Sequence, residues 1–214
     1  MKSSGIVKTA VGAAEPARGL YNPEEFRDNC GFGMIAHQQG VASHKLLQTA
    51  IESLTCMTHR GGIAADGKTG DGCGLLLQMP TAFLRSCASL LLGRELKTTF
   101  AVGMVFMSRE LAAQDQVRKA FDKAAQEFDF TVATWRVVPT QPDICGEIAL
   151  EQLPQIEQVF LETDNASHEE VAARLFMVRR RVEIAMADDA DFYICSLSDR
   201  VISYKGLVMP ADLE

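Results

Sequence analysis

Cys30 is the residue of this 214-residue chain whose setting best supports nucleophilic chemistry. It starts an apolar run, and Gly31 and Gly33 leave the backbone beside it open to a small molecule. If the Asn29–Cys30 bond were cut, Cys30 would carry a thiol and a free α-amine, with ordinary pKa values of about 8.5 and about 7.7–8.0. The amine could then accept the thiol proton at neutral pH, with no histidine needed. The alternative is that Cys30 is a buried structural thiol, which is the commoner role of a lone cysteine. The chain would then be a non-catalytic interaction module.

A glycine-rich segment supplies the second group of candidate residues. Six of the sixteen glycines lie between Gly61 and Gly74, which indicates turns with positive φ or a very close approach to another group. Loops of this kind on a rigid scaffold often carry function. Arg60 precedes the segment at the end of a predicted helix, where the helix dipole also favours a cation.

Residues 62–69 match the phosphate-binding pattern G-x-x-x-x-G-K-[ST] letter for letter. Such a loop follows a buried strand and leads into a helix whose N-terminus faces the phosphates. Here a predicted helix precedes the loop and an apolar strand follows it, so nucleotide binding is a minor alternative that a helix starting at Thr69 would favour. We also predict no metal site, because Cys56 and His59 have no second ligand pair.

The elements that must position these residues alternate between helices and strands. Ser43 is a predicted N-cap of a helix whose apolar positions continue to Met57, and Ser167 forms a capping box with Glu170. The apolar run Gly31–His37 is predicted to be a buried strand. Further helices are predicted at 81–92 and 110–128, and strands at 75–79, 100–107, 130–138, 156–161, 192–197 and 201–204, the last two as a hairpin around Ser198-Asp199.

Composition and charge exclude several classes of protein. The chain is 47% hydrophobic and 23% charged, close to the globular average. Its net charge of −7 opposes nucleic acid as the main partner, because phosphate binding needs a basic face. No apolar run approaches the ~18–20 residues of a membrane helix, and the N-terminal segment has no secretory apolar region. We therefore expect a cytoplasmic protein with no membrane partner and with its six cysteines reduced.

Several sequence blocks together resemble the class II glutamine amidotransferase domain of the glutamate synthases. The blocks are Asp28–Gly33, His59–Gly62, Ala65–Gly74, Cys145–Glu147 and Ser203–Leu207. Other class II amidotransferases share the Cys-Gly-x-Gly opening and remain an alternative, but the Thr-Gly-Asp-Gly-Cys-Gly stretch favours the glutamate synthases.

The resemblance implies a role for Cys30 and a boundary beside it. Residues 1–29 would be a propeptide, Asn29–Cys30 its processing site, and 30–214 the amidotransferase domain. Cys30 would attack L-glutamine, form a γ-glutamyl thioester and release ammonia, and water would then free glutamate.

The resemblance also implies a fold and a pocket. The α+β fold would be the Ntn-hydrolase sandwich of four layers, αββα. Arg60 would line the glutamine pocket, and Asp66, Asp71 and Gly72 would shape it.

A larger assembly is implied as well. Ammonia would reach a synthase site with FMN and a 3Fe-4S cluster, where 2-oxoglutarate becomes glutamate, and a small FAD-containing subunit would pass on electrons from NADPH. No motif for these cofactors lies in this chain, and the family's later motifs, His-Ser-Arg-Phe-Ser-Thr and His-Asn-Gly-Glu, have no match. We therefore expect a sandwich that is incomplete at its C-terminal side, and no competent glutaminase without the remainder of the large subunit.

Overall fold

The computed structural model describes residues 31–58, 62–164 and 166–213. The chain divides into two compact units, residues 1–32 and 33–214. Every described helix and strand belongs to the second unit, and the fold below is the fold of that unit.

A sheet of four antiparallel strands forms the centre of this unit, in the order β3-β4-β2-β5. The two inner strands are buried along nearly their whole length. Because successive side chains of a strand point to opposite faces, both faces of the sheet are covered. The strands are β2 (Thr99–Met107), β3 (Thr131–Val137), β4 (Gln155–Thr163) and β5 (Tyr193–Ser198).

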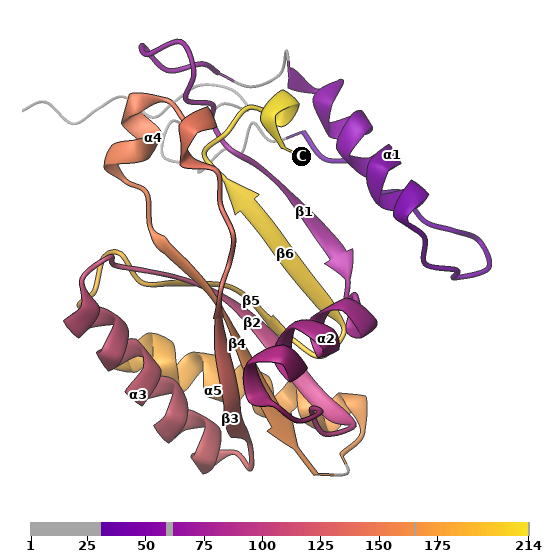
Figure 1. The fold of residues 1–214 in the computed structure, drawn as a ribbon, viewed down its shortest axis with the longest axis vertical. Coiled ribbons are helices and arrows are strands. Elements are labelled where there is room, and N and C mark those ends of the chain that lie inside the picture. The colour runs from indigo at the N-terminus through magenta and orange to yellow at the C-terminus, as the bar shows by residue number, and fades with distance from the viewer. Residues whose placement is uncertain (1–30, 59–61, 165, 214) are drawn as a thin grey trace, which may run out of the picture. The chain divides into compact units, whose positions relative to one another are not determined.

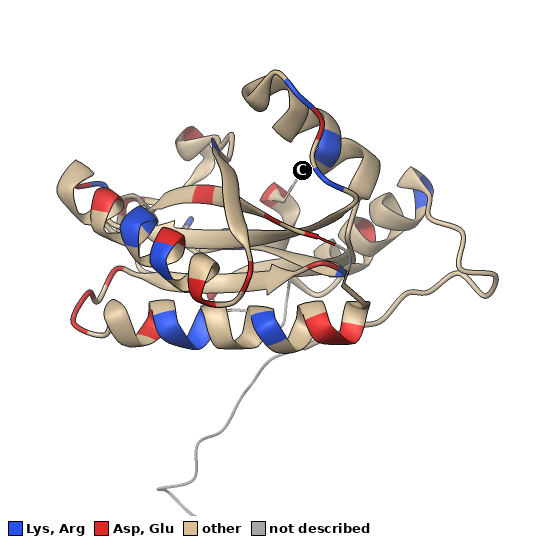
Figure 2. Cartoon of the chain, turned by 90° about the horizontal axis from the view of Figure 1, so that it is seen from below, with Lys and Arg blue, Asp and Glu red and all other residues tan. Residues whose placement is uncertain are grey.

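Helices α3 (Leu111–Glu127) and α5 (His168–Ala185) cover one face of this sheet (Figure 1). Phe121 of α3 and Val178 of α5 pack in one buried cluster with Val105 of β2. Acidic and basic positions are interspersed along the helices (Figure 2), so no surface of a single charge is built there.

The opposite face packs against helix α2 (Thr81–Leu92) and a second, two-stranded sheet. This smaller sheet pairs β1 (Cys73–Gln78) antiparallel with β6 (Val201–Gly206). A second buried cluster joins Leu84 of α2, Phe160 of β4 and Ile202 of β6. The remaining elements are α1 (His44–Thr55), which lies against β1 and η3 (Pro210–Asp212), with η2 (Pro142–Ile144) and α4 (Glu147–Glu151).

The predicted helices and caps are confirmed. Helices α2 and α3 lie within one residue of their predicted bounds, and α5 begins directly after the predicted cap Ser167. Ser43 accepts a hydrogen bond from the Leu46 amide, and Ser167 and Glu170 form the reciprocal capping box. The predicted α+β class, with antiparallel sheets, is confirmed as well.

The predicted hairpin at 192–204 is wrong in its pairing. The strand β5 pairs with β2, whereas β6 pairs with β1 in the other sheet. At the turn between them, Ser198 Oγ accepts from the Arg200 and Val201 amides, at 3.0 and 3.3 Å, and the chain passes from one sheet to the other. An alternating pattern fixes which face of a strand is buried, but it leaves the partner strand open.

The predicted buried strand at Gly31–His37 is also wrong. The segment is irregular and exposed, with Phe32 92% and Met34 89% accessible. Its last residue, His37, accepts a turn hydrogen bond from the Gly40 amide instead. An apolar run becomes a strand only beside a partner that satisfies its backbone groups, and the pattern by itself provides none.

Candidate functional site: a glycine-rich loop beside an apolar cavity

The structure describes only part of the predicted site. Asn29, Cys30 and Arg60 lie outside the described residues, whereas Asp66, Asp71 and Gly72 lie inside them. These three belong to the loop at 62–72 that leads into β1.

Asp71 ties the end of this loop to its beginning. Its Oδ2 accepts a hydrogen bond of 2.5 Å from the amide of Gly62, and a Cβ at Gly62 would lie 2.9 Å from both carboxylate oxygens. Inside the loop, Ile63 and Gly70 form an antiparallel bridge. The loop is thus closed on itself and leads into a strand. No helix starts at Thr69, so the nucleotide-binding alternative is wrong.

Asp66 anchors the same loop to α4. Its Oδ1 accepts from the amides of Lys68 and Thr69, at 3.0 and 2.8 Å. Its Oδ2 accepts from the Thr69 hydroxyl at 2.5 Å and from the Ile148 amide at 3.1 Å. Chiefly through the Thr69 hydroxyl, these donors hold the pKa of the Asp66 carboxyl well below its usual range. Asp66 is therefore ionised and fully engaged by the protein.

Thr69 and Gly146 complete this contact, and neither is among the site residues that the sequence predicts. The Thr69 hydroxyl oxygen also accepts from the Ala149 amide, at 3.2 Å, and the residue is 5% exposed. A Cβ at Gly146 would meet Asp66 Oδ2, Thr69 Oγ1 and, at 2.7 Å, the Thr69 amide nitrogen. The sequence signal that points to this contact is Gly146, which lies in the block Cys145–Glu147, about 80 residues after the loop.

Two further glycines lie where another backbone segment approaches closely. A Cβ at Gly70, in the loop, would lie 3.0 Å from the Val208 carbonyl oxygen in the chain that follows β6, and one at Gly74, in β1, would lie 2.5 Å from the Tyr204 carbonyl oxygen of β6. Gly72 has φ +99°, which is strained for any residue with a side chain. Both reasons for glycine that the sequence suggested, positive φ and close approach, therefore apply.

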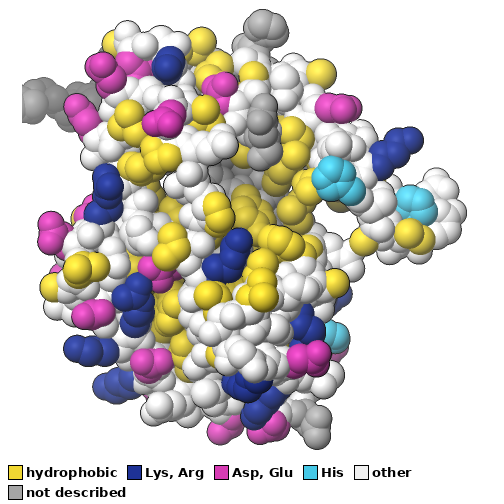
Figure 3. Space-filling view, in the orientation of Figure 1, with side chains coloured by type: hydrophobic (Ala, Val, Ile, Leu, Met, Phe, Trp, Pro, Cys, Tyr) yellow, Lys and Arg dark blue, Asp and Glu magenta, His cyan; other side chains and the backbone are white. Residues whose placement is uncertain are grey.

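Asp71 and Gly72 line a cavity of about 1040 Å³. Its wall continues through β1 and β6, the segment 138–145 and α4 to residues 207–213. Much of the lining is apolar, and Figure 3 shows hydrophobic side chains gathered around the hollow on this face. The residues that contribute include Leu75, Met104, Phe106, Pro142, Leu153 and Tyr204. Asp66 and Thr69 stand behind this wall and do not line it.

Two thiols near the small sheet are poor nucleophiles. Burial raises the pKa of Cys73, with a further contribution from Asp212, and burial likewise raises the pKa of Cys195. Within the described ranges, no three His, Cys, Asp or Glu side chains converge as metal ligands do. Among the same residues, no helix combines the length and apolarity needed to cross a membrane.

Residues 30–214 match the model of the family described as "Glutamine amidotransferases class-II", and the chain belongs to that family. Among curated proteins it is 38% identical over 208 residues to the glutamate synthase (NADPH) large chain of Azospirillum brasilense. The corresponding chain of Bacillus subtilis is 35% identical, and the glutamate synthase (NADH) of Saccharomyces cerevisiae is 33% identical. These alignments cover 95%, 92% and 92% of this chain but only 14%, 13% and 10% of the relatives, so the chain spans a small part of their length.

Proposed function

We propose that this chain is the glutamine-hydrolysing part of a glutamate synthase and that Cys30 is its nucleophile. The observation that carries the proposal is where the family match begins: it starts at residue 30, the cysteine that a cut after Asn29 would place at the N-terminus. Residues 1–29 are then a propeptide, and 30–214 belong to the amidotransferase domain.

The reaction follows from a thiol and an amine on one residue. The free α-amine of Cys30 takes the thiol proton, and the thiolate attacks the side-chain amide carbon of L-glutamine. The C–N bond breaks, the nitrogen leaves with a proton as ammonia, and a γ-glutamyl thioester remains. Water then attacks the thioester, which releases glutamate and restores the thiol.

Glutamine binds, in this proposal, at the cavity beside the glycine-rich loop. Arg60 lines the glutamine pocket, as the resemblance implies. Asp71 closes the loop that follows in the sequence, because its carboxylate accepts from the Gly62 amide. Gly72 and the anchored Asp66 shape the wall.

The fold proposed for the complete domain is the four-layer αββα sandwich of the Ntn hydrolases. It is supported by two antiparallel sheets that pack face to face, with α3 and α5 outside the larger one. The small sheet has two strands here, and further chain from the remainder of the large subunit would extend it.

The ammonia serves reductive amination of 2-oxoglutarate in the cytoplasm, with FMN, a 3Fe-4S cluster and a small FAD-containing subunit that delivers electrons from NADPH. The cluster needs cysteine thiolates that converge, and the described residues offer no such set. We propose that these cofactors bind in other parts of a longer protein, since this chain covers only 14% of the Azospirillum brasilense glutamate synthase large chain.

The test is glutaminase activity of the protein that carries this chain, made from its own gene. Mass spectrometry and N-terminal sequencing should find a mature chain that begins at Cys30. Cys30→Ala should lower glutamine hydrolysis at least about a thousandfold. Cys56→Ala is the matched control, since Cys56 is an exposed free thiol and its loss should leave the rate unchanged. Retained hydrolysis in Cys30→Ala would overturn the proposal, because another group would then be the nucleophile.

A further inference from the structure

We propose that Thr69 is a positioning residue of the glutamine site and that it acts by clamping the glycine-rich loop to α4. The clamp consists of Thr69, Asp66 and Gly146. The inference rests on the function proposed above and adds a residue to its machinery.

The hydroxyl of Thr69 is used twice. It donates to Asp66 Oδ2 at 2.5 Å and accepts from the Ala149 amide at 3.2 Å. Asp66 in turn accepts from the Ile148 amide, at 3.1 Å. Two hydrogen bonds thus join two side chains of the loop to two consecutive amides in the first turn of α4, and a third joins these side chains to each other.

Steric fit makes the clamp specific to these residues. Gly146 immediately precedes α4, and its missing side chain is the space that Asp66 and Thr69 occupy. The contact therefore fails in two independent ways, through loss of the hydroxyl or through a methyl group added at Gly146.

The clamp joins two walls of one cavity. The first wall is the end of the loop, with Asp71 and Gly72. The second wall is α4 and the residues beside it, with Cys145, Ala149 and Gln152. All five residues line the cavity, whereas Thr69 and Asp66 do not. Thr69 is buried and both of its polar functions are satisfied inside the protein. It thus acts on a bound substrate only by fixing how far apart the two walls stand.

If a wall of the cavity contacts glutamine equally in the ground state and in the transition state, a shift of that wall changes the KM more than kcat. The chemical step keeps its rate because the nucleophile is unchanged. Thr69→Val keeps the branched shape and removes the hydroxyl. We expect it to raise the KM for glutamine about tenfold while kcat stays within about twofold. Thr69→Ser keeps the hydroxyl and should restore the wild-type KM. Gly146→Ala should raise the KM like Thr69→Val.

The assay uses the active protein that carries this chain, with Cys30→Ala as the reference for no hydrolysis. If the wild type shows no Cys30-dependent hydrolysis, the proposed function fails. If the wild type is active and Thr69→Val keeps the wild-type KM, or if Thr69→Ser does not rescue it, the clamp is wrong and the proposed function stands.

Hydrogen exchange tests the clamp without any turnover. The amides of Ile148 and Ala149 should exchange at least about tenfold faster in Thr69→Val than in the wild type, and at the wild-type rate in Thr69→Ser. Amides of α5, such as Val178, serve as the internal control and should not change. Unaltered protection at Ile148 and Ala149 in Thr69→Val would overturn the inference, whatever the activity of that variant.

Discussion

Asp66 stabilises its loop as an anion, and the structure therefore predicts a pH-dependent stability. The pKa of its carboxyl is lowered from the ordinary 3.8 in the folded chain, so its contribution is complete above pH 3.8 and is lost as the pH falls below that value. Asp66→Asn keeps the size but leaves the Thr69 hydroxyl or the Ile148 amide without its acceptor. We expect a lower urea midpoint than wild type at pH 6 and a difference that shrinks toward pH 2.5. Asp188→Asn, an exposed carboxylate after α5, is the control. A difference that is constant with pH would contradict the assignment.

Glycine at position 74 is required by the backbone opposite it. A Cβ there would lie 2.5 Å from the Tyr204 carbonyl oxygen and 2.8 Å from Lys205 Cβ, its direct partner across β1 and β6. The carbonyl cannot yield without distorting the ladder, so Gly74→Ala should cost about 1–3 kcal/mol of unfolding free energy. Gly33→Ala, where nothing lies within 4 Å, should stay within about 0.5 kcal/mol. Chemical denaturation of both variants measures the contrast, and equal losses would refute it.

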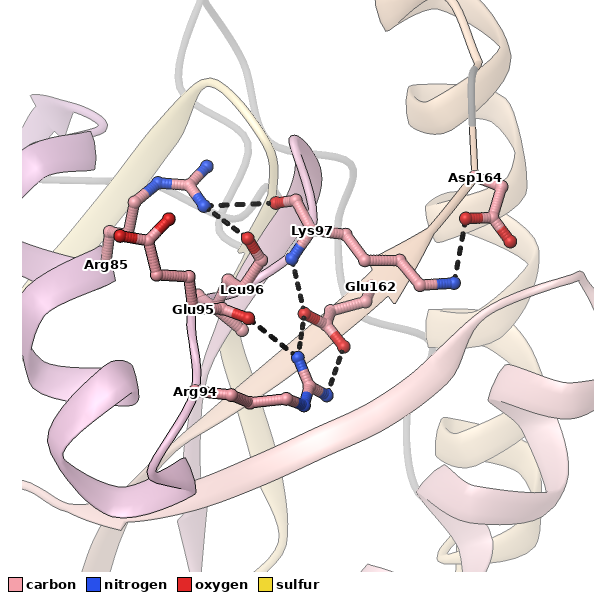
Figure 4. A network of polar contacts seen from close by, with 7 residues as sticks. All are labelled: Arg85, Arg94, Glu95, Leu96, Lys97, Glu162 and Asp164. Atoms are coloured by element: carbon pink, nitrogen blue, oxygen red, sulfur yellow. Dashed lines mark hydrogen bonds and ion pairs between the residues drawn. The ribbon is translucent and has the colours of Figure 1, made fainter.

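At the scale of elements, the connection between α2 and β2 is fastened to the end of β4 by one buried carboxylate (Figure 4). Glu162, whose side chain is 2% exposed, accepts from Arg94 Nη1 and Nη2, at 3.0 and 2.8 Å, and from the Lys97 amide at 2.6 Å. The hydrogen bonds from Arg94 are the main reason that the pKa of Glu162 is lowered. On the other side of the connection, Arg85 donates to the carbonyls of Leu96 and Lys97.

Removal of Arg94 should leave the Glu162 carboxylate buried, with the Lys97 amide as its remaining hydrogen-bond donor. Because Arg94 is half exposed, we expect Arg94→Met to cost about 1–3 kcal/mol at pH 7. The pKa of Glu162 lies below its ordinary 4.5, so the stabilisation is present above pH 4.5 and the penalty of the variant fades as the pH falls below it. Asp164→Ala breaks only the exposed pair with Lys97 and should cost under about 1 kcal/mol. Thermal melts of both variants at pH 7 and pH 3.5 measure these losses of stability. Equal losses in Arg94→Met and Asp164→Ala would contradict the prediction.

The sequence predicts individual elements well, but it does not predict which elements contact one another. Helices were predictable because their signals are local: Ser43 and Ser167 cap the turns that directly follow them. Strand partners were not, since the side chains of 192–204 satisfy the same alternation whether β6 pairs with β5 or with β1. Likewise the glycine-rich loop stood out as a candidate site, but its contact with Gly146 depends on how α4 folds back over it.

Across the whole second unit, the central sheet belongs to two cores at once. Val105 of β2 packs beneath α3 and α5, while Val102 of the same strand packs with α2 and the small sheet. The strand β4 divides its side chains in the same way, with Leu161 on one face and Phe160 on the other. Loss of packing on one face therefore weakens strands that the other face needs, and residues 33–214 should unfold as one cooperative unit.

The only tryptophan of the chain makes this cooperativity measurable. Trp135 packs edge-on against Phe121, at 5.2 Å between ring centroids, on the α3 side of the sheet. Leu84 is fully buried on the opposite side, and Leu84→Ala should cost about 2–5 kcal/mol. At about 2–4 °C per kcal/mol, the melting curves from Trp135 fluorescence and from far-ultraviolet circular dichroism should shift down together by the same amount. Leu90→Ala, 87% exposed on the same helix, should move neither. If the Trp135 transition keeps its midpoint while the circular dichroism transition falls, the two cores unfold separately, and the sheet between them does not couple its two faces.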